Sequence, residues 1–363
     1  MENLTRQQYY KSTMEENSLR EKLLTSEVKT VQRSWNDAQS SPYIPINLTV
    51  LIPKERITFN LYMKVAQKGS QEVSFPLFLK EGEAWECQWQ ELLAQKGIDR
   101  LYFLKEDLER VIGYLNNYLQ MLKYESAKVT PELLAVFSEQ LHYSIRKAYQ
   151  SPRFGPGVQK AQGLVEDMIE RMQQDPGAMK LIWKVLYHNF NLYTHSINLC
   201  LLGTAFMLFL KKSARESRDL GLAGLYHDIG MTRIPQEIIL KDGPLTPGER
   251  VEVNHHPAMG HRLLSRGTSL AYLPNEVLRL SLEHHENADG SGYPLGLPLA
   301  RQHPWTRIIR LLDTYEALTV TRPYRAAYKP FEAVKILQES RGSRGPIYDP
   351  PTLKNFIAFL VTE

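Results

Sequence analysis

The chain has 363 residues, of which 43% are hydrophobic, 10% aromatic and 23% charged. These values are ordinary for globular proteins and exclude a mostly disordered chain, a collagen and a coiled-coil rod. The net charge of +4 mildly favours an anionic ligand, but no stripe of lysine and arginine indicates a DNA-binding protein. Cys87 and Cys200 lie far apart and outside any CxxC motif, which excludes a disulfide framework and favours a reducing cytoplasm.

The N-terminal segment lacks the order of a signal peptide, because no apolar run follows its charged residues. Residues 1–41 are polar and predict a leader or a helical arm, through which a homodimer could form. The longest apolar run, residues 197–210, has about fourteen residues, fewer than the roughly twenty that a membrane-spanning helix needs. We therefore expect a buried helix there, no membrane span and a cytoplasmic protein.

Short apolar or alternating runs, which are typical of strands, begin near residue 46 and are separated by turn signals. They occupy residues 46–52, 57–65, 72–79 and 99–104. Amphipathic stretches at residues 85–95 and 106–124 predict two helices. Together these elements predict a small α+β domain at residues 42–125, with Trp85 and Trp89 in its core. We expect it to have a sensory or regulatory role.

Beyond residue 130 the pattern is helical nearly to the end of the chain. Helices are expected at residues 131–149, 158–173, 177–211, 214–228, 247–266, 274–286, 305–320 and 330–340. One start is well marked, because Thr246 can cap the helix while Glu249 reaches back to it. The sequence thus predicts a mainly α chain, with a helical connector at residues 126–180 and an all-helical domain at residues 181–363.

Histidine indicates the chemistry of this helical part. With 10 histidines in 363 residues, about 0.3 adjacent pairs are expected by chance, yet two occur. They are His255-His256 and His284-His285. Taken singly, a histidine on an apolar helix is more often a core residue, and a His-Asp pair at a helix end is as often a cap. Several imidazoles and carboxylates that converge from different helices are, however, the ligands of divalent cations.

The order of motifs resembles that of the HD-GYP family, bacterial phosphodiesterases of the HD superfamily that hydrolyse cyclic di-GMP. The matching segments are HS at 195–196, HDIG at 227–230, KDGPLT at 241–246, HPAMG at 256–260, HHENADGSGYP at 284–294 and RIIRLLDTYEALTVTRPYR at 307–325. They lie within residues 185–360, about half of the chain. The resemblance implies an all-helical HD-GYP catalytic domain at the C-terminus.

The resemblance also implies seven ligands for two divalent transition-metal ions. Mixed histidine and carboxylate donors suit iron or manganese. The ligands are His195, His227, Asp228, His256, His284, His285 and Asp313. Asp228 would bridge the ions and, with His227, form the catalytic pair. A water between two ions has a pKa of about 7 and attacks phosphorus as hydroxide. Glu316 is expected to support a ligand histidine.

The resemblance implies substrate contacts as well. Arg322 and Arg325 match positions that meet phosphate, to which a planar guanidinium can make two parallel bonds, and Tyr293 matches the tyrosine of the GYP loop. Without the resemblance, the arginine pair would be interpreted as a solvated pair at a helix end. Glu286 and Asp289 are expected to shape the loop.

Two positions depart from the family's pattern. Met231 stands where a lysine usually approaches substrate phosphate, so one charged contact is missing. Asn191 replaces a glutamate that helps some members bind a third metal, and His188 on the same helix face is expected to pack rather than to bind. Two ions are therefore expected rather than three. His255 has no counterpart and is expected at the surface or beside a ligand.

Three functions follow from these features. The first is a phosphodiesterase that converts cyclic di-GMP to pGpG and then to GMP, with diguanylate cyclase-type proteins as partners of the GYP loop. The second, motivated by Met231, is a receptor or interaction module that binds a cyclic dinucleotide with little turnover. The third is hydrolysis of cyclic GMP-AMP or of a phosphomonoester, and the arginine pair favours a cyclic dinucleotide over the monoester.

Overall fold

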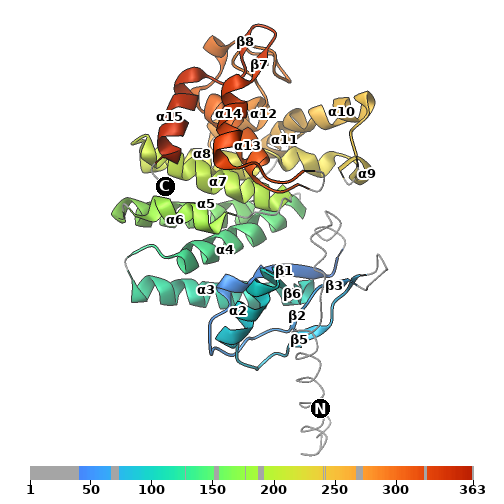
Figure 1. Cartoon of the computed structure of the whole chain (residues 1–363), viewed down its shortest axis with the longest axis vertical. Coiled ribbons are helices and arrows are strands. Elements are labelled where there is room, and N and C mark those ends of the chain that lie inside the picture. The colour runs from blue at the N-terminus through green and yellow to red at the C-terminus, as the bar shows by residue number, and fades with distance from the viewer. Residues whose placement is uncertain are drawn as a thin grey trace, which may run out of the picture. The chain divides into compact units, whose positions relative to one another are not determined.

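The computed structural model describes residues 41–66, 73–126, 128–150, 155–175, 177–186, 192–239, 241, 243–266, 273–322 and 325–361. The expectations for the polar leader, apart from its last residue, and for His188 and Asn191 fall outside these residues. The chain divides into two compact units, with the boundary after Met121. Each unit is shown in Figure 1, the first in blue to teal and the second in green to red.

The first unit holds a four-stranded antiparallel sheet in the order β1-β6-β2-β5. The strands are β1 (Tyr43–Asn47), β2 (Leu61–Tyr62), β5 (Leu77–Leu79) and β6 (Arg100–Leu104), and β3 (Val65–Ala66) pairs separately with β4 (Val73–Ser74). The helices are η2 (Leu48–Val50), α2 (Cys87–Gln95), η3 (Lys105–Asp107) and α3 (Leu108–Glu125). These elements confirm the predicted small α+β region.

The sheet's core follows from alternation, because every second side chain of β1 and β6 is buried. The strand predicted at residues 46–52 begins and ends earlier than expected, at Tyr43–Asn47. Asn47 ends it, since its side chain accepts a hydrogen bond from the backbone N–H of Thr49 and starts the 3-10 helix η2. Trp85 is fully buried, as expected for the core, whereas Trp89 is half-buried and packs edge-on against it.

Helices make up the second unit, and the only strands described in it are the short pair β7 (Arg341–Gly342) and β8 (Gly345–Pro346). The longer helices are α4 (Pro131–Gln150), α5 (Gly155–Gln174), α6 (Ala178–Val185), α7 (Leu192–Phe209), α8 (Ala214–Tyr226), α10 (Pro247–Asn254), α11 (His256–Ser265), α12 (Asn275–Glu283), α13 (Pro304–Thr319), α14 (Pro330–Glu339) and α15 (Pro350–Leu360). Shorter turns are η4 (Ile229–Arg233), α9 (Gln236–Ile239) and η6 (Leu299–Arg301). The prediction of a mainly α fold is confirmed.

Helix α7 is the central helix of this unit and is apolar on all sides. Among the described residues only α7 has the length and composition of a membrane-spanning helix, but 89% of that segment is buried inside the protein. It is the buried helix that the apolar run at residues 197–210 predicts. Helix α8 packs closely on it, because Gly224 has no side chain. A Cβ there would lie 2.9 Å from the carbonyl group of Leu199.

Two of the predicted helices are each two helices. The stretch at residues 177–211 contains α6 and α7. The stretch at residues 247–266 breaks at His255, because Pro257 has no N–H to bond the carbonyl of Val253. The ring of His256 bonds that carbonyl instead, with 2.7 Å from Nδ1 to the oxygen. The helix break therefore orients a predicted metal ligand.

Candidate metal centre

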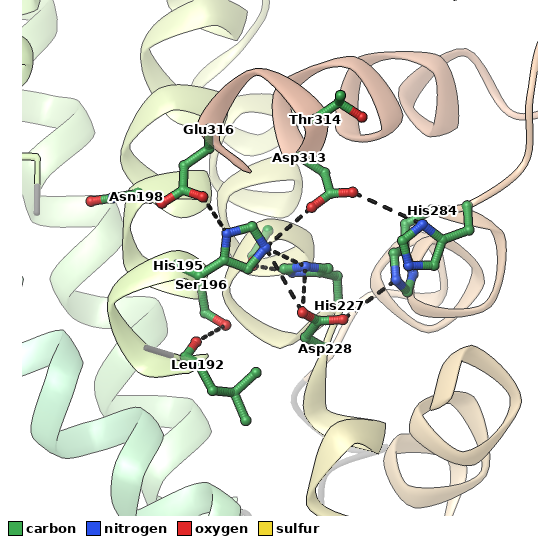
Figure 2. Close-up of polar contacts among 12 residues, drawn as sticks. Leu192, His195, Ser196, Asn198, His227, Asp228, His284, Asp313, Thr314 and Glu316 are labelled. Atoms are coloured by element: carbon green, nitrogen blue, oxygen red, sulfur yellow. Dashed lines mark hydrogen bonds and ion pairs between the residues drawn. The ribbon is translucent and has the colours of Figure 1, made fainter. Parts of the chain in front are cut away.

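The seven predicted ligands come together from five parts of the second unit, and Figure 2 shows several of them pointing toward one another. His195 lies on α7, His227 and Asp228 follow α8, His256 begins α11, His284 and His285 follow α12, and Asp313 lies on α13. Their ligand atoms form two groups, and within each group these atoms lie within 4.8 Å of one another. One group is His195, His227 and Asp313, and the other is Asp228, His256, His284 and His285.

In the first group, the Nε2 atom of His195 lies 3.2 Å from Nε2 of His227 and 3.1 Å from Oδ1 of Asp313. In the second, Nε2 of His256 lies 3.0 Å from Nε2 of His284. Each group therefore has histidine ring nitrogens and a carboxylate oxygen directed at one small space. Such a donor set is what a divalent transition-metal ion requires.

Asp228 faces both groups with different oxygens. Its Oδ2 lies 3.3 Å from Nε2 of His227 and 3.8 Å from Nε2 of His195. Its Oδ1 lies 3.1 Å from Nε2 of His256 and 3.6 Å from Nε2 of His284. A carboxylate in this position can bridge two cations.

Three of the histidine rings are fixed by the helix ends at which they stand. His227 donates from Nδ1 to the carbonyl of Gly224 at 2.8 Å, and His284 donates from Nδ1 to that of Ser281 at 2.9 Å. His256 bonds the carbonyl of Val253 in the same way. These carbonyls belong to last helical turns, where the regular hydrogen bonds of the helix run out. The same bonds place a lone pair on each Nε2, as metal-binding histidines require.

Charge also favours a cation at this centre. Burial, together with the neighbouring His227 and His256, lowers the pKa of His284 to about 4 against the opposing effect of Asp228, so that the ring is neutral. Nε2 of His284 therefore carries a lone pair, and it faces Nε2 of His256 at 3.0 Å. Two lone pairs repel at this distance unless a cation lies beside them. The donors thus fit a metal ion.

His195 is held by Glu316 beyond the centre, and Asn198 holds Glu316 in turn. Its Nδ1 lies 2.5 Å from Oε2 of Glu316, and Oε1 of Glu316 accepts a hydrogen bond from Asn198 at 2.7 Å. Burial lowers the pKa of His195, but the charges of Glu316 and Asp313 outweigh this effect and raise it to about 10. This confirms the expected contact of Glu316 with a histidine of the centre. Asn198 was not predicted, although a polar residue three positions after His195 on an apolar helix was a usable signal.

The HDIG segment brings Asp228 to His256 through a close approach of η4 to α11. A Cβ on Gly230 would lie 1.9 Å from the carbonyl oxygen of His256 and 2.6 Å from the amide nitrogen of Gly260. Only glycine can occupy this position without moving the start of α11. The glycine of the motif is therefore needed for the geometry of the centre.

Glu286 shapes the GYP loop, as expected. Its carboxylate accepts hydrogen bonds from the backbone N–H groups of Leu295, Gly296 and Leu297, at 2.7, 3.2 and 2.8 Å. Asp289 accepts one from the backbone N–H of Ser291 at 3.0 Å.

The loop also carries Tyr293 to the centre. Its ring stacks on His285, with the ring centroids 4.7 Å apart. Nδ1 of His285 lies 3.9 Å from Oδ2 of Asp313, so His285 is the most distant of the predicted ligands from its carboxylate neighbour.

The two predicted phosphate-binding arginines lie just after α13, and their backbones bond each other. The guanidinium of Arg325 donates to the carbonyls of Ala317 and Leu318 at 2.5 and 3.0 Å, and it lies 4.6 Å from the ring centre of Tyr328. It thereby caps the C-terminal end of α13. Arg322 is half-buried. Contact of either arginine with substrate stays a prediction.

The remaining predicted positions lie as follows. Met231 is half-buried in η4, and its backbone N–H bonds the carbonyl of Asp228 at 2.9 Å. The side chain of His255 is 58% exposed, which confirms the expected surface position. Thr246 and Glu249 form the expected reciprocal cap of α10.

Glu316→Gln tests the support of His195. We expect this substitution to weaken metal affinity about 10- to 100-fold, because the amide cannot balance the ring's proton as a carboxylate does. Metal affinity is measured by competition with a chelator. Glu339→Gln on exposed α14 is the matched control and should leave affinity unchanged. Equal affinity in both variants would show that Glu316 does not support the centre.

Comparisons with known proteins agree with this geometry. Residues 188–351 match the family model of the HD domain. The chain is 29% identical over 225 residues to the cyclic di-GMP phosphodiesterase PA4108 of Pseudomonas aeruginosa, which covers 61% of this chain and 53% of that protein. It is 36% identical over 121 residues to the 3'3'-cGAMP-specific phosphodiesterase 1 of Vibrio cholerae, which covers 33% of this chain and 27% of that protein.

Among solved structures, Bd1817, an HDG"Y"P protein from Bdellovibrio bacteriovorus, matches with a TM-score of 0.66. The match covers 88% of this chain and 99% of that chain at 16% identity, which shows a shared fold. Residues 188–351, which carry the His-Asp centre, thus match an HD domain. The motifs of this part of the chain, and the relatives that it matches, are similar to those of the HD-GYP family. The chain spans about half the length of the Pseudomonas relative.

Proposed function

We propose that the chain is a metal-dependent phosphodiesterase that hydrolyses cyclic di-GMP to pGpG and then to GMP. The observation that carries this proposal is the position of Asp228, whose two oxygens face two separate groups of ligands. Metal pairs that share a carboxylate are used for the hydrolysis of phosphate esters. The names of the two relatives support cyclic dinucleotides as the class of substrate.

The proposed centre holds two divalent ions through the seven side chains of the two groups, and its imidazole and carboxylate donors suit iron or manganese. Such ions supply a water of lowered pKa and neutralise charge on the phosphodiester. The protein supplies rings that are oriented in advance. Carbonyls of helix ends hold His227, His256 and His284, and Glu316 holds His195, so little reorganisation is needed.

Cyclic GMP-AMP is the second candidate substrate. The Vibrio relative, at 36% identity, is named as specific for this nucleotide. Both nucleotides are rings with two phosphodiester groups, so the same metal centre can act on either. We propose a cytoplasmic location for the protein, where a buried free thiol such as that of Cys200 stays reduced.

The test of the function is product analysis. Protein reconstituted anaerobically with Fe²⁺ or Mn²⁺ is incubated separately with cyclic di-GMP, cyclic GMP-AMP and pGpG, and the products are separated by chromatography. We expect pGpG to form from cyclic di-GMP, and we expect a chelator to abolish its formation because the ions supply the nucleophile.

Each other outcome has a defined meaning. Faster cleavage of cyclic GMP-AMP would favour the second substrate. Tight binding of a cyclic dinucleotide without any product would contradict an enzyme and favour a receptor, for which the missing charge at Met231 is the rationale. Release of GMP from pGpG alone would assign the centre to a monoester or linear substrate.

A further inference from the structure

Arg310 lies at the edge of the metal centre, on α13 and one turn before Asp313. Its Nη1 atom is 3.9 Å from Oδ2 of Asp313, which is beyond hydrogen-bond distance. The side chain of Arg310 is 17% exposed. The arginine is therefore a partly buried cation directly beside a proposed metal ligand, and the sequence motifs did not predict it.

The guanidinium is fixed in place by three neighbours. Its Nε donates to Oδ1 of Asn287 in the GYP loop at 3.0 Å, and its Nη1 donates to Oγ1 of Thr314 at 2.6 Å. Its central carbon lies 5.3 Å from the ring centre of Tyr348, the position of a cation–π contact. These contacts order the group before any ligand binds, which lowers the entropy cost of binding.

One edge of this guanidinium has donors to spare. Within the described part of the chain, Nη2 has no hydrogen-bond partner, although an arginine carries five N–H donors. The carboxylate nearest to it, Asp313, also lies 3.1 Å from Nε2 of His195 on its other oxygen and is one of the proposed metal ligands. If Asp313 binds a metal ion, the ion neutralises part of the negative charge of this carboxylate. The positive charge of Arg310 is then less compensated by Asp313 and can attract a further anion.

The charge of Arg310 acts on the same space as the GYP tyrosine. Burial and the carboxylates of Asp313 and Asp228 raise the pKa of Tyr293, and Arg310 opposes them. Tyr293 in turn stacks on His285. Arg310 is thus near the side of the centre that the GYP loop forms.

A cyclic dinucleotide has two phosphodiester groups, and a single metal pair can neutralise only the one that reacts. The other group needs a cation that is not already bonded. Arg325 already donates to the carbonyls of Ala317, Leu318 and Ala326. Arg310 has both N–H groups of Nη2 free among the described residues, and its position is fixed, so it meets this need better than Arg325.

We propose that Arg310 is a substrate-binding residue that donates from Nη2 to a phosphodiester oxygen of the bound cyclic dinucleotide. The proposal rests on the proposed function of the centre. It adds a positive charge beside the metal pair in a chain that has methionine at position 231. Arginine suits this role, because hydrogen bonds from a guanidinium to phosphate are strong and directional.

The test measures affinity without turnover. Manganese-loaded protein is titrated with a phosphorothioate analogue of cyclic di-GMP, which resists hydrolysis. Arg310→Gln is expected to weaken binding about 10- to 100-fold while two ions per chain remain bound. Arg310→Lys keeps the charge and should recover part of the loss.

Arg307→Gln is the matched control. Arg307 stands one turn earlier on the same helix and donates to the carbonyl of Leu299 at 2.8 Å, with Asp349 at 4.0 Å. This variant should lower the melting temperature but change the affinity for the analogue less than about twofold.

Three results would overturn the proposal. Unchanged affinity in Arg310→Gln would show that the arginine does not meet the nucleotide. Loss of metal from both Arg310→Gln and Arg310→Lys would assign the residue to holding Asp313. Failure of the unmodified, metal-loaded protein to bind or cleave any cyclic dinucleotide would remove the proposed function itself, and this inference with it.

Discussion

Asp228→Ala is expected to reduce the metal content from two ions per chain to nearly none and to reduce phosphodiester hydrolysis at least about a thousandfold. The reason is the position of this carboxylate between the two groups of ligands, 3.3 Å from His227 on one side and 3.1 Å from His256 on the other. Its removal takes one donor from each ion. It also leaves the imidazole nitrogens of the two groups without the negative charge that now lies between them. Elemental analysis and product analysis measure the two effects.

The control for this variant is Asp349→Ala. Asp349 is also a buried aspartate of the second unit, but it caps α15 by accepting a hydrogen bond from the N–H of Thr352 at 3.1 Å. Its loss should cost about 1 kcal/mol of stability and leave the metal content at two ions. If Asp228→Ala retained both ions, the bridge would have to lie elsewhere.

Gly230→Ala is expected to lower the free energy of unfolding by about 3 kcal/mol and to weaken metal binding together with it. The added methyl group would meet the carbonyl oxygen of His256 at 1.9 Å, so α11 would have to move away from η4. That movement would carry His256 away from Asp228, which it now approaches to 3.1 Å. A drop of about 6–12 °C in melting temperature should accompany the change.

Gly248→Ala provides the matched control, because a Cβ on Gly248 in α10 would have no neighbour within 4 Å. Replacing a helical glycine by alanine in open space is expected to be neutral or stabilising by up to about 1 kcal/mol. Equal melting temperatures for Gly230→Ala and Gly248→Ala would contradict the requirement for glycine in the HDIG segment.

Much of this architecture could be predicted from sequence, since helix periodicity and capping are local. Thr246 and Glu249 show this, because both members of the cap lie within four residues. The break at Pro257 was missed although its cause is also local, because the apolar spacing continues across it. The short pair β7 and β8 was missed because its two-residue strands are too short to show a pattern.

In the candidate site, too, some features could be predicted from the sequence and others could not. The seven proposed ligands could be named from motif order, but how they share Asp228 depends on the packing of five chain segments. Arg310 could not be singled out, since an arginine on an amphipathic helix is usually solvated. Its bonds to Asn287 and Thr314 and its contact with Tyr348 are tertiary facts. The hydrogen bonds by which Arg325 caps α13 are likewise contacts that no sequence pattern predicts.

The central claim is a pair of metal ions bridged by Asp228, and anomalous diffraction from crystals of manganese-reconstituted protein tests it most directly. We expect two anomalous peaks about 3.5–4 Å apart. One should lie between His195, His227 and Asp313, and the other beside His256, His284 and His285, with one oxygen of Asp228 toward each. A single peak, or two peaks that do not share Asp228, would contradict the two-metal centre.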